Sequence, residues 1–135
     1  MSLTQFANEH RESTADLSML SIGSADPAMT ARFYAAALGW EVTHSDDSYG
    51  MVEGNGIKIG FGKIEGFRPA QWPDGADVKR FHRDLQVDDL DKAAERLCAI
   101  GASQPDCQHG AWSWRVLLDS DGRPFYLNPL PATTP

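Results

Sequence analysis

The stretch that decides the fold is DPAMTARFYAAALGW, residues 26–40. It opens with an N-cap carboxylate at Asp26 and continues with Pro27, whose missing N–H costs nothing in the first turn of a helix. Apolar side chains then recur with helical spacing, and Gly39 can adopt the left-handed conformation that ends a helix. The stripe consists of Met29, Phe33, Ala36 and Ala37. This stretch predicts one amphipathic helix packed on a core.

Strand signals lie on both sides of this helix. Residues 17–22 are apolar on both faces, with Leu20 and Ile22 on one side, which indicates a buried strand. After the helix we expect short strands at residues 40–43, 49–53 and 57–61. Gly54-Asn55-Gly56 provides the positive φ angles of a tight hairpin between the last two. The resulting order is βαβββ.

The same order of signals then repeats. DDLDKAAERLCAIG, residues 88–101, begins with a capping pair and stops at Gly101, which follows Gly39 by 62 positions. Strands are expected at residues 81–87, 112–118 and 123–127, with a turn at 119–122. We therefore predict an α+β domain of two βαβββ modules. Its parts are an arm at 1–15, module one at 16–65, a linker at 66–78, module two at 79–130 and a tail at 131–135.

Composition narrows the classes of partner and location. The formal net charge is -7 and Lys and Arg do not cluster, which argues against nucleic acid because phosphate binding needs concentrated positive charge. No run approaches the roughly 18 apolar residues of a membrane helix, and the first residues lack the order of a secretory signal. We expect a cytoplasmic protein with free thiols at Cys98 and Cys107.

Three segments together resemble the glyoxalase-like branch of the vicinal-oxygen-chelate superfamily, which includes glyoxalases, bleomycin resistance proteins and extradiol dioxygenases. They are the helix at 26–40, the strand and cap FHRDLQVDDLD at 81–91, and the turn and strand DSDGRPF at 119–125. The resemblance covers nearly all of residues 16–130. It implies a cup-shaped mixed half-barrel with the helices outside, and a homodimer. It does not choose among the reactions and binding functions that this fold supports.

Strand alternation assigns side chains to the cup. If Leu20, Ile22, Leu85 and Val87 pack under the helices, the residues between them line the opposite, cup face. The resemblance places the four metal ligands of related enzymes at Leu17, Gly60, His82 and Tyr126. Only His82 has an ordinary metal-binding side chain, since leucine and glycine offer no lone pair and a neutral phenol is a poor ligand. We therefore expect no metal cofactor.

His82 and Asp84 point the same way from one strand and are the candidate catalytic residues. Histidine is suited to general base work because its ordinary pKa lies nearest neutral pH. The alternative interpretation is a histidine satisfied by a neighbouring carboxylate without chemistry. The predicted ligand-binding set also contains aromatic and cup-face residues: Leu17, Met19, Lys58, Gly60, Trp72, His82, Asp84, Gln86, Trp112 and Tyr126.

The leading functional hypothesis is metal-independent binding of a small aromatic or hydrophobic molecule in the cup. A second is an enzyme, either an isomerase or hydrolase that uses His82 and Asp84 or a lyase with a metal on unusual ligands. A third is a regulatory or interaction protein with a vestigial cup. Two interpretations of Trp72 are left open: it forms a lid over the cup, or it is a plug that fills the space between the modules.

Overall fold

The computed structural model describes residues 2–5, 14–68, 82–108, 110 and 113–130. Module one consists of a four-stranded sheet and one helix. The sheet has the order β1-β4-β3-β2, with β1 parallel to β4 and the other pairs antiparallel. Its elements are β1 (Leu20–Ser24), α2 (Pro27–Leu38), β2 (Glu41–Ser45), β3 (Tyr49–Gly54) and β4 (Ile57–Lys63). The predicted βαβββ order is confirmed for this module.

The capping signals of the opening stretch are confirmed, but the predicted apolar stripe is wrong in part. Met29 and Ala36 are exposed, and the buried face of α2 consists of Pro27, Thr30, Ala31, Phe33 and Tyr34. The Asp26 side chain accepts a hydrogen bond from the backbone N–H of Met29 at 3.2 Å, and Pro27 is the first helical residue. Gly39 ends α2 with φ 69°, a left-handed conformation that glycine adopts without steric cost.

The second module is shorter. It contains β5 (Arg83–Val87), α3 (Leu90–Ala99), β6 (Arg115–Leu118) and β7 (Pro124–Pro129), in the sheet order β5-β7-β6. The parallel β5–β7 pair repeats the β1–β4 pair of module one. Where module one has β2, the described part of module two has a single bridge between Ser103 and Leu118. Thus the modules share one plan, and within the described residues their two mixed sheets stay separate and do not close into a barrel.

Two predicted strand bounds need correction. β1 begins at Leu20, three residues later than expected, and Leu17 lies before it with 88% of its surface exposed. The register explains this, because Leu20 pairs with Ile59 and Leu17 would face Gly56 in the hairpin turn. β6 begins at Arg115, while most of the predicted linker and Trp112 lie outside the described residues.

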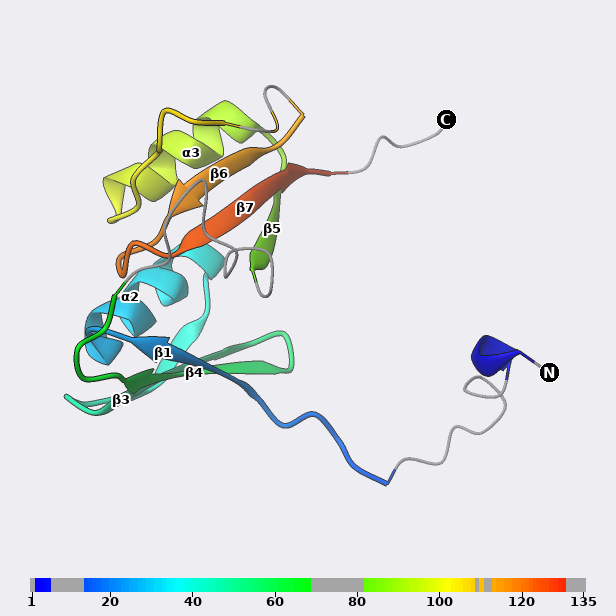
Figure 1. Ribbon diagram of the computed structural model, residues 1–135, viewed down its shortest axis with the longest axis vertical. Coiled ribbons are helices and arrows are strands. Elements are labelled where there is room, and N and C mark those ends of the chain that lie inside the picture. Colours follow the sequence, from blue (N-terminus) through cyan, green and yellow to red (C-terminus); the bar gives the residue numbers. More distant parts are fainter. Residues whose placement is uncertain (1, 6–13, 69–81, 109, 111–112, 131–135) are drawn as a thin grey trace.

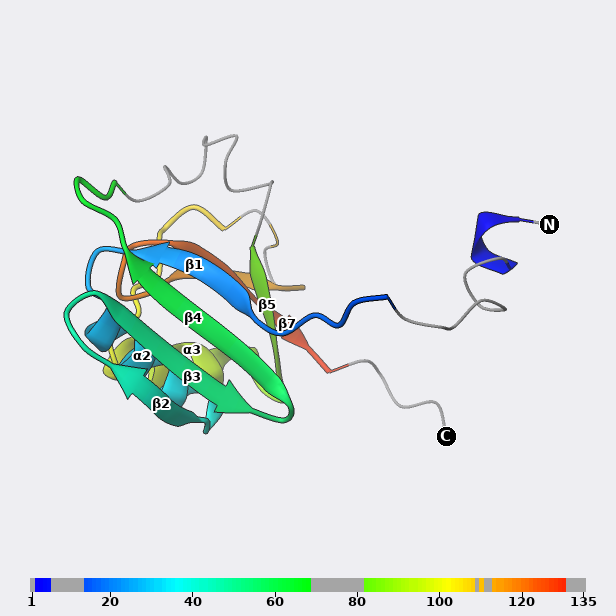
Figure 2. The same ribbon diagram turned by 90° about the horizontal axis from the view of Figure 1, so that it is seen from below.

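Both sheets turn their helix faces toward one core, with α2 between them (Figures 1 and 2). The Tyr34 ring of α2 stacks on Phe61 of β4 at 5.4 Å and meets Phe125 of β7 edge-on at 6.4 Å. Phe33 of α2 also packs edge-on against Phe125, at 6.0 Å. Because aromatic rings bury large apolar areas, these contacts join the modules through α2.

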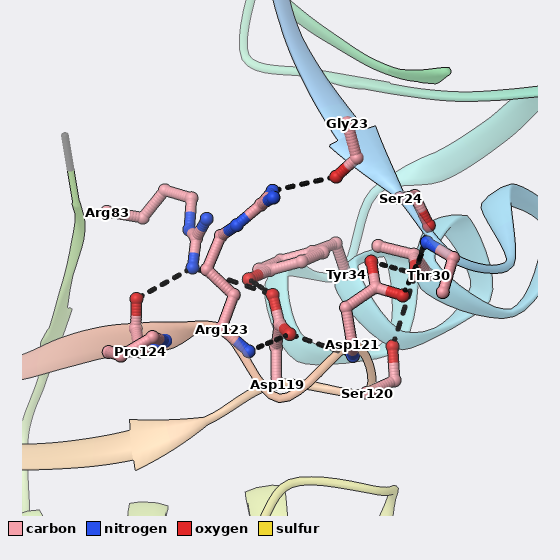
Figure 3. A network of polar contacts seen from close by, with 11 residues as sticks. Gly23, Ser24, Thr30, Tyr34, Arg83, Asp119, Ser120, Asp121, Arg123 and Pro124 are labelled. Carbon is pink, nitrogen blue, oxygen red and sulfur yellow. Dashed lines mark hydrogen bonds and ion pairs between the residues drawn. The ribbon is translucent and has the colours of Figure 1, made fainter. Parts of the chain in front are cut away.

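Polar contacts of Asp119, the first residue of the turn between β6 and β7, also join the modules (Figure 3). Its Oδ2 accepts a hydrogen bond from the Tyr34 hydroxyl at 2.6 Å and lies 3.5 Å from Arg83 Nη2. Its Oδ1 accepts from the backbone N–H groups of Asp121 and Arg123, at 2.9 and 3.0 Å. One buried carboxylate thus holds the turn in shape and ties it to α2 and β5.

The same turn reaches the end of β1. Asp121 accepts hydrogen bonds from the Ala25 backbone N–H at 3.1 Å and from the Thr30 hydroxyl at 2.8 Å. The Arg123 guanidinium donates to the Gly23 carbonyl at 2.8 Å. Burial, together with the charge of Arg83, lowers the pKa of Arg123. The turn sequence therefore builds an interface between the modules as well as reversing the chain.

Neither α2 nor α3, the two long helices of the described residues, has the length and apolar run that crossing a membrane requires.

We expect Tyr34→Phe to lower the free energy of unfolding by about 1–3 kcal/mol, because Asp119 loses its shortest hydrogen bond in a buried setting. Urea denaturation measures this change. Tyr49→Phe is the matched control, since the Tyr49 hydroxyl contacts only the Met19 sulfur, at 3.9 Å, among its described hydrogen bonds. Equal losses in the two variants would contradict a special role for the Tyr34 contact.

The same contact predicts a dependence on alkaline pH. Burial first, and then the charge of and hydrogen bond to Asp119, raise the pKa of Tyr34 well above the ordinary tyrosine value. The folded state therefore holds this proton more tightly than the unfolded chain, and the resulting stability is lost as pH rises above about 10. Unfolding free energies measured from pH 8 to 11.5 should fall more steeply for the wild type than for Tyr34→Phe. Parallel curves would contradict the prediction.

Candidate functional site

A row of three aromatic rings crosses the cup face of the second sheet. His82 immediately precedes β5, Tyr126 lies on the central strand β7, and Trp114 immediately precedes β6. The His82 and Tyr126 rings stack at 4.2 Å between centroids with 11° between planes. The Trp114 and Tyr126 rings stack at 5.0 Å and 9°. We call these three side chains the ring ladder.

Sheet register explains the ladder. Asp84 and Val116 lie opposite Tyr126 on the two neighbouring strands. His82 and Trp114 are each two residues before those positions, so all these side chains share a face. Aromatic rings at such diagonal positions are within reach of one another. The His82 and Trp114 rings therefore lie on either side of the Tyr126 ring.

The ladder is covered at one end and open at the other. Gly110 lies so close to the Trp114 ring that a Cβ atom there would overlap it, so glycine lets the chain cover that ring. At the other end, β5 pairs only with β7 among the described strands. The His82 side chain keeps 32% of its surface exposed. Solvent and ligands can therefore reach the ladder at His82.

An ion pair and a hydrogen bond hold the polar group beside the ladder. His82 Nδ1 lies 3.0 Å from Asp84 Oδ2. The other carboxylate oxygen, Asp84 Oδ1, accepts from the Asn128 side-chain amide at 3.0 Å. Burial, followed by the Asp84 charge, raises the pKa of Tyr126, which favours its neutral phenol. The site thus combines a flat apolar row with an anchored histidine.

The predicted cup residues of module one lie on the other sheet. Gly60 is buried beneath Tyr49 and Met19, whose side chains occupy the space that a Cβ atom at residue 60 would need. Lys58 is exposed and pairs with Glu53 on the neighbouring strand at 3.6 Å. Between described residues, no hydrogen bond, ion pair or ring contact links this group to the ring ladder.

The four positions implied by the family do not fit a divalent ion. Leu17 and Gly60 offer no donor atom, and Gly60 has no room for a longer side chain. The Tyr126 phenol lies between two rings. Within the described residues, no three His, Cys, Asp or Glu side chains are grouped so that they could hold one ion. Of the four positions implied by the family, only His82 has an ordinary metal-binding side chain.

The sequence predictions for this face have mixed outcomes. His82, Asp84, Gln86 and Tyr126 lie on one face of the second sheet, as the alternation predicts, and their role in ligand binding stays a prediction. The structure brings the first two and Tyr126 together, while Gln86 lies exposed further along β5. Trp72 and Trp112, predicted ligand-binding residues, lie outside the described part of the chain.

Two residues were missing from the predicted site. Trp114 belongs to the ladder and Asn128 holds Asp84. Both share the face of Tyr126, and the signal that could have selected them is the pairing of β7 with β5 and β6. The predicted set included Leu17, which lies exposed before β1.

A separate shallow hollow of about 240 Å³ lies away from the ladder. It lies beside the two helices and the β6–β7 turn, lined by Met29, Arg32, Phe33, Ile100, Gly101 and Ser120. We place the candidate site at the ladder because that face combines hydrogen-bonding groups with apolar rings, as ligand sites do.

Comparison with known structures defines the class of fold. The chain is similar to a glyoxalase/bleomycin resistance protein/dioxygenase family enzyme from Burkholderia phytofirmans, with a TM-score of 0.64 and 19% identity over 87% of this chain and 100% of that one. A fosfomycin resistance protein from Listeria monocytogenes gives a TM-score of 0.62 and 16% identity over 87% and 94%. This is the fold of the vicinal-oxygen-chelate superfamily.

A bleomycin-binding protein solved in complex with bleomycin gives a TM-score of 0.51 and 23% identity over 87% of this chain and 100% of that one. No curated protein sequence matches the chain. The family profile of the glyoxalase-like domain matches residues 19–128. The chain therefore belongs to the glyoxalase-like domain family.

Proposed function

We propose that this protein binds a small aromatic or hydrophobic molecule on the cup face of the second sheet, without a metal cofactor. The ring ladder, with an anchored histidine at its open end, is the observation that carries the proposal. Binding sites for small molecules commonly combine apolar walls with a few fixed polar groups. The structural neighbours include a protein complexed with bleomycin and a fosfomycin resistance protein, which is consistent with a drug or a similar compound as ligand.

A second candidate function is catalysis by an isomerase or hydrolase that uses His82 as a general base. The 3.0 Å contact with Asp84 favours it, because a carboxylate on one ring nitrogen orients the other toward a substrate. In this case His82→Ala would abolish turnover of a bound compound while leaving much of its affinity. A lyase that uses a metal is disfavoured by the donor set at the four family positions.

The binding proposal predicts saturable quenching of tryptophan fluorescence by members of an aromatic and antibiotic library, because Trp114 is part of the ladder. The titration is run on protein dialysed against a chelator, with metal content measured alongside. Trp40→Phe is the matched control, since Trp40 packs against the core. It should keep the quenching that Trp114→Phe loses.

Two results would contradict the proposal. One is the absence of saturable quenching by any compound. The other is a stoichiometric divalent ion that survives dialysis and is required for binding, which would support the metal-dependent lyase instead.

We also propose that the protein forms a homodimer. In one chain the cup-face residues of the two modules lie on separate sheets, and within the described part of the chain no polar or ring contact joins Gly60 or Lys58 to the ladder. A second copy could supply the opposite wall of the cup, as the family resemblance implies. Light scattering coupled to size-exclusion chromatography should give about twice the chain mass of 14.8 kDa. A mass of one chain at high micromolar concentration would contradict this.

A further inference from the structure

We infer that Asp84 and Asn128 hold His82 in the form that carries its proton on Nδ1, so that Nε2 accepts a hydrogen bond from the ligand. The site would then select flat apolar molecules that carry an uncharged or cationic N–H or O–H donor. This inference rests on the proposed binding function and specifies the chemical class of its ligand.

The tautomer follows from the chemistry of the three groups. An ionised carboxylate carries only lone pairs and negative charge, so Asp84 Oδ2 at 3.0 Å would repel an unprotonated Nδ1 and favours the form with a proton on that nitrogen. In a neutral imidazole the other nitrogen, Nε2, then has a free lone pair. The structure thus assigns Nε2 the role of acceptor whenever the ring is neutral.

Asn128 makes this arrangement rigid. Its amide donates to Asp84 Oδ1 at 3.0 Å, so both carboxylate oxygens have a partner. Asp84 therefore cannot rotate toward solvent without losing a hydrogen bond. Stacking on Tyr126 at 4.2 Å fixes the plane of the His82 ring as well. Asn128 is a positioning residue for this acceptor.

Nε2 is available to a ligand. Among the described residues, the polar contact of the His82 ring is the one through Nδ1, and the side chain is about one-third exposed. Side chains stand roughly perpendicular to a sheet, which directs the far edges of the ladder rings toward a molecule above them. The edges of aromatic rings carry partial positive charge and attract the face of another ring. A flat ligand therefore suits this surface.

Negative charge near His82 further disfavours anionic ligands. Asp84 places a negative charge beside the acceptor, and the whole chain has a formal net charge of -7. Lys58, on the other sheet, already pairs with Glu53. A ligand carboxylate at Nε2 would meet a lone pair and a nearby anion, both repulsive, whereas a phenol or an amine would meet an acceptor.

Equilibrium dialysis with three naphthalenes of similar shape tests the selection. The compounds are 2-naphthol, which has a donor, 2-methoxynaphthalene, which lacks one, and 2-naphthoate, which is an anion. We expect the wild type at pH 8 to bind 2-naphthol about tenfold more tightly than the methyl ether, as the loss of one hydrogen bond implies, and 2-naphthoate weakest. His82→Ala and Asp84→Ala should remove the preference for 2-naphthol. His44→Ala, which removes the other carboxylate-paired histidine, should keep it.

Nitrogen-15 NMR of the imidazoles tests the geometry without a ligand. The neutral form of His82 should carry its proton on Nδ1 in the wild type and become a mixture of tautomers in Asp84→Ala. A proton on Nε2 in the wild type would overturn the inference. Equal affinity for 2-naphthol and its methyl ether would also overturn it while leaving the binding function intact. Failure of all three compounds to bind would count against both the proposed function and the inference.

Discussion

The fold depends most on the buried carboxylate of Asp119. It lies in the turn of the second module, yet its shortest hydrogen bond comes from Tyr34 in the helix of the first. Arg83 approaches the same oxygen from β5, and neighbouring turn residues reach the end of β1. A buried charge is costly unless it is surrounded by hydrogen-bond donors, so these partners have to stay in place together. The relative position of the two modules follows from this requirement and from the aromatic core around α2.

Strand β5 serves both the core and the candidate site because side chains alternate along it. Arg83 points to the helix face and enters the network around Asp119, while His82 and Asp84 point to the cup face. A shift of one residue in the pairing of β5 with β7 would exchange these roles. The contacts that hold the modules together therefore also fix the register on which the ring ladder depends.

Much of the fold could be predicted from local signals. Asp26, Pro27 and Gly39 mark the ends of α2, and in module two Asp89 caps the start of α3 while Gly101 follows its C-cap residue Ile100. Alternation assigned His82, Asp84 and Tyr126 to one face because it needs only local periodicity. The roles of Tyr34 and Asp119 could not be predicted in this way, since they are 85 positions apart and meet only through packing of the modules. The shortened β6 and the late start of β1 likewise depend on which residues their partner strands offer.

The position of His82, Asp84 and Asn128 affects how easily their side chains can be exchanged in evolution. His82, Asp84 and Asn128 all lie at the surface or partly exposed, and none belongs to the buried core cluster. Substitutions at such positions usually alter stability by less than about 0.5 kcal/mol. Selection can therefore exchange these three side chains for others with little loss of stability, and under the proposed function such exchanges would alter the preferred ligand. The strands of the second sheet separate these side chains from the buried contacts around Asp119, so the two faces can change independently.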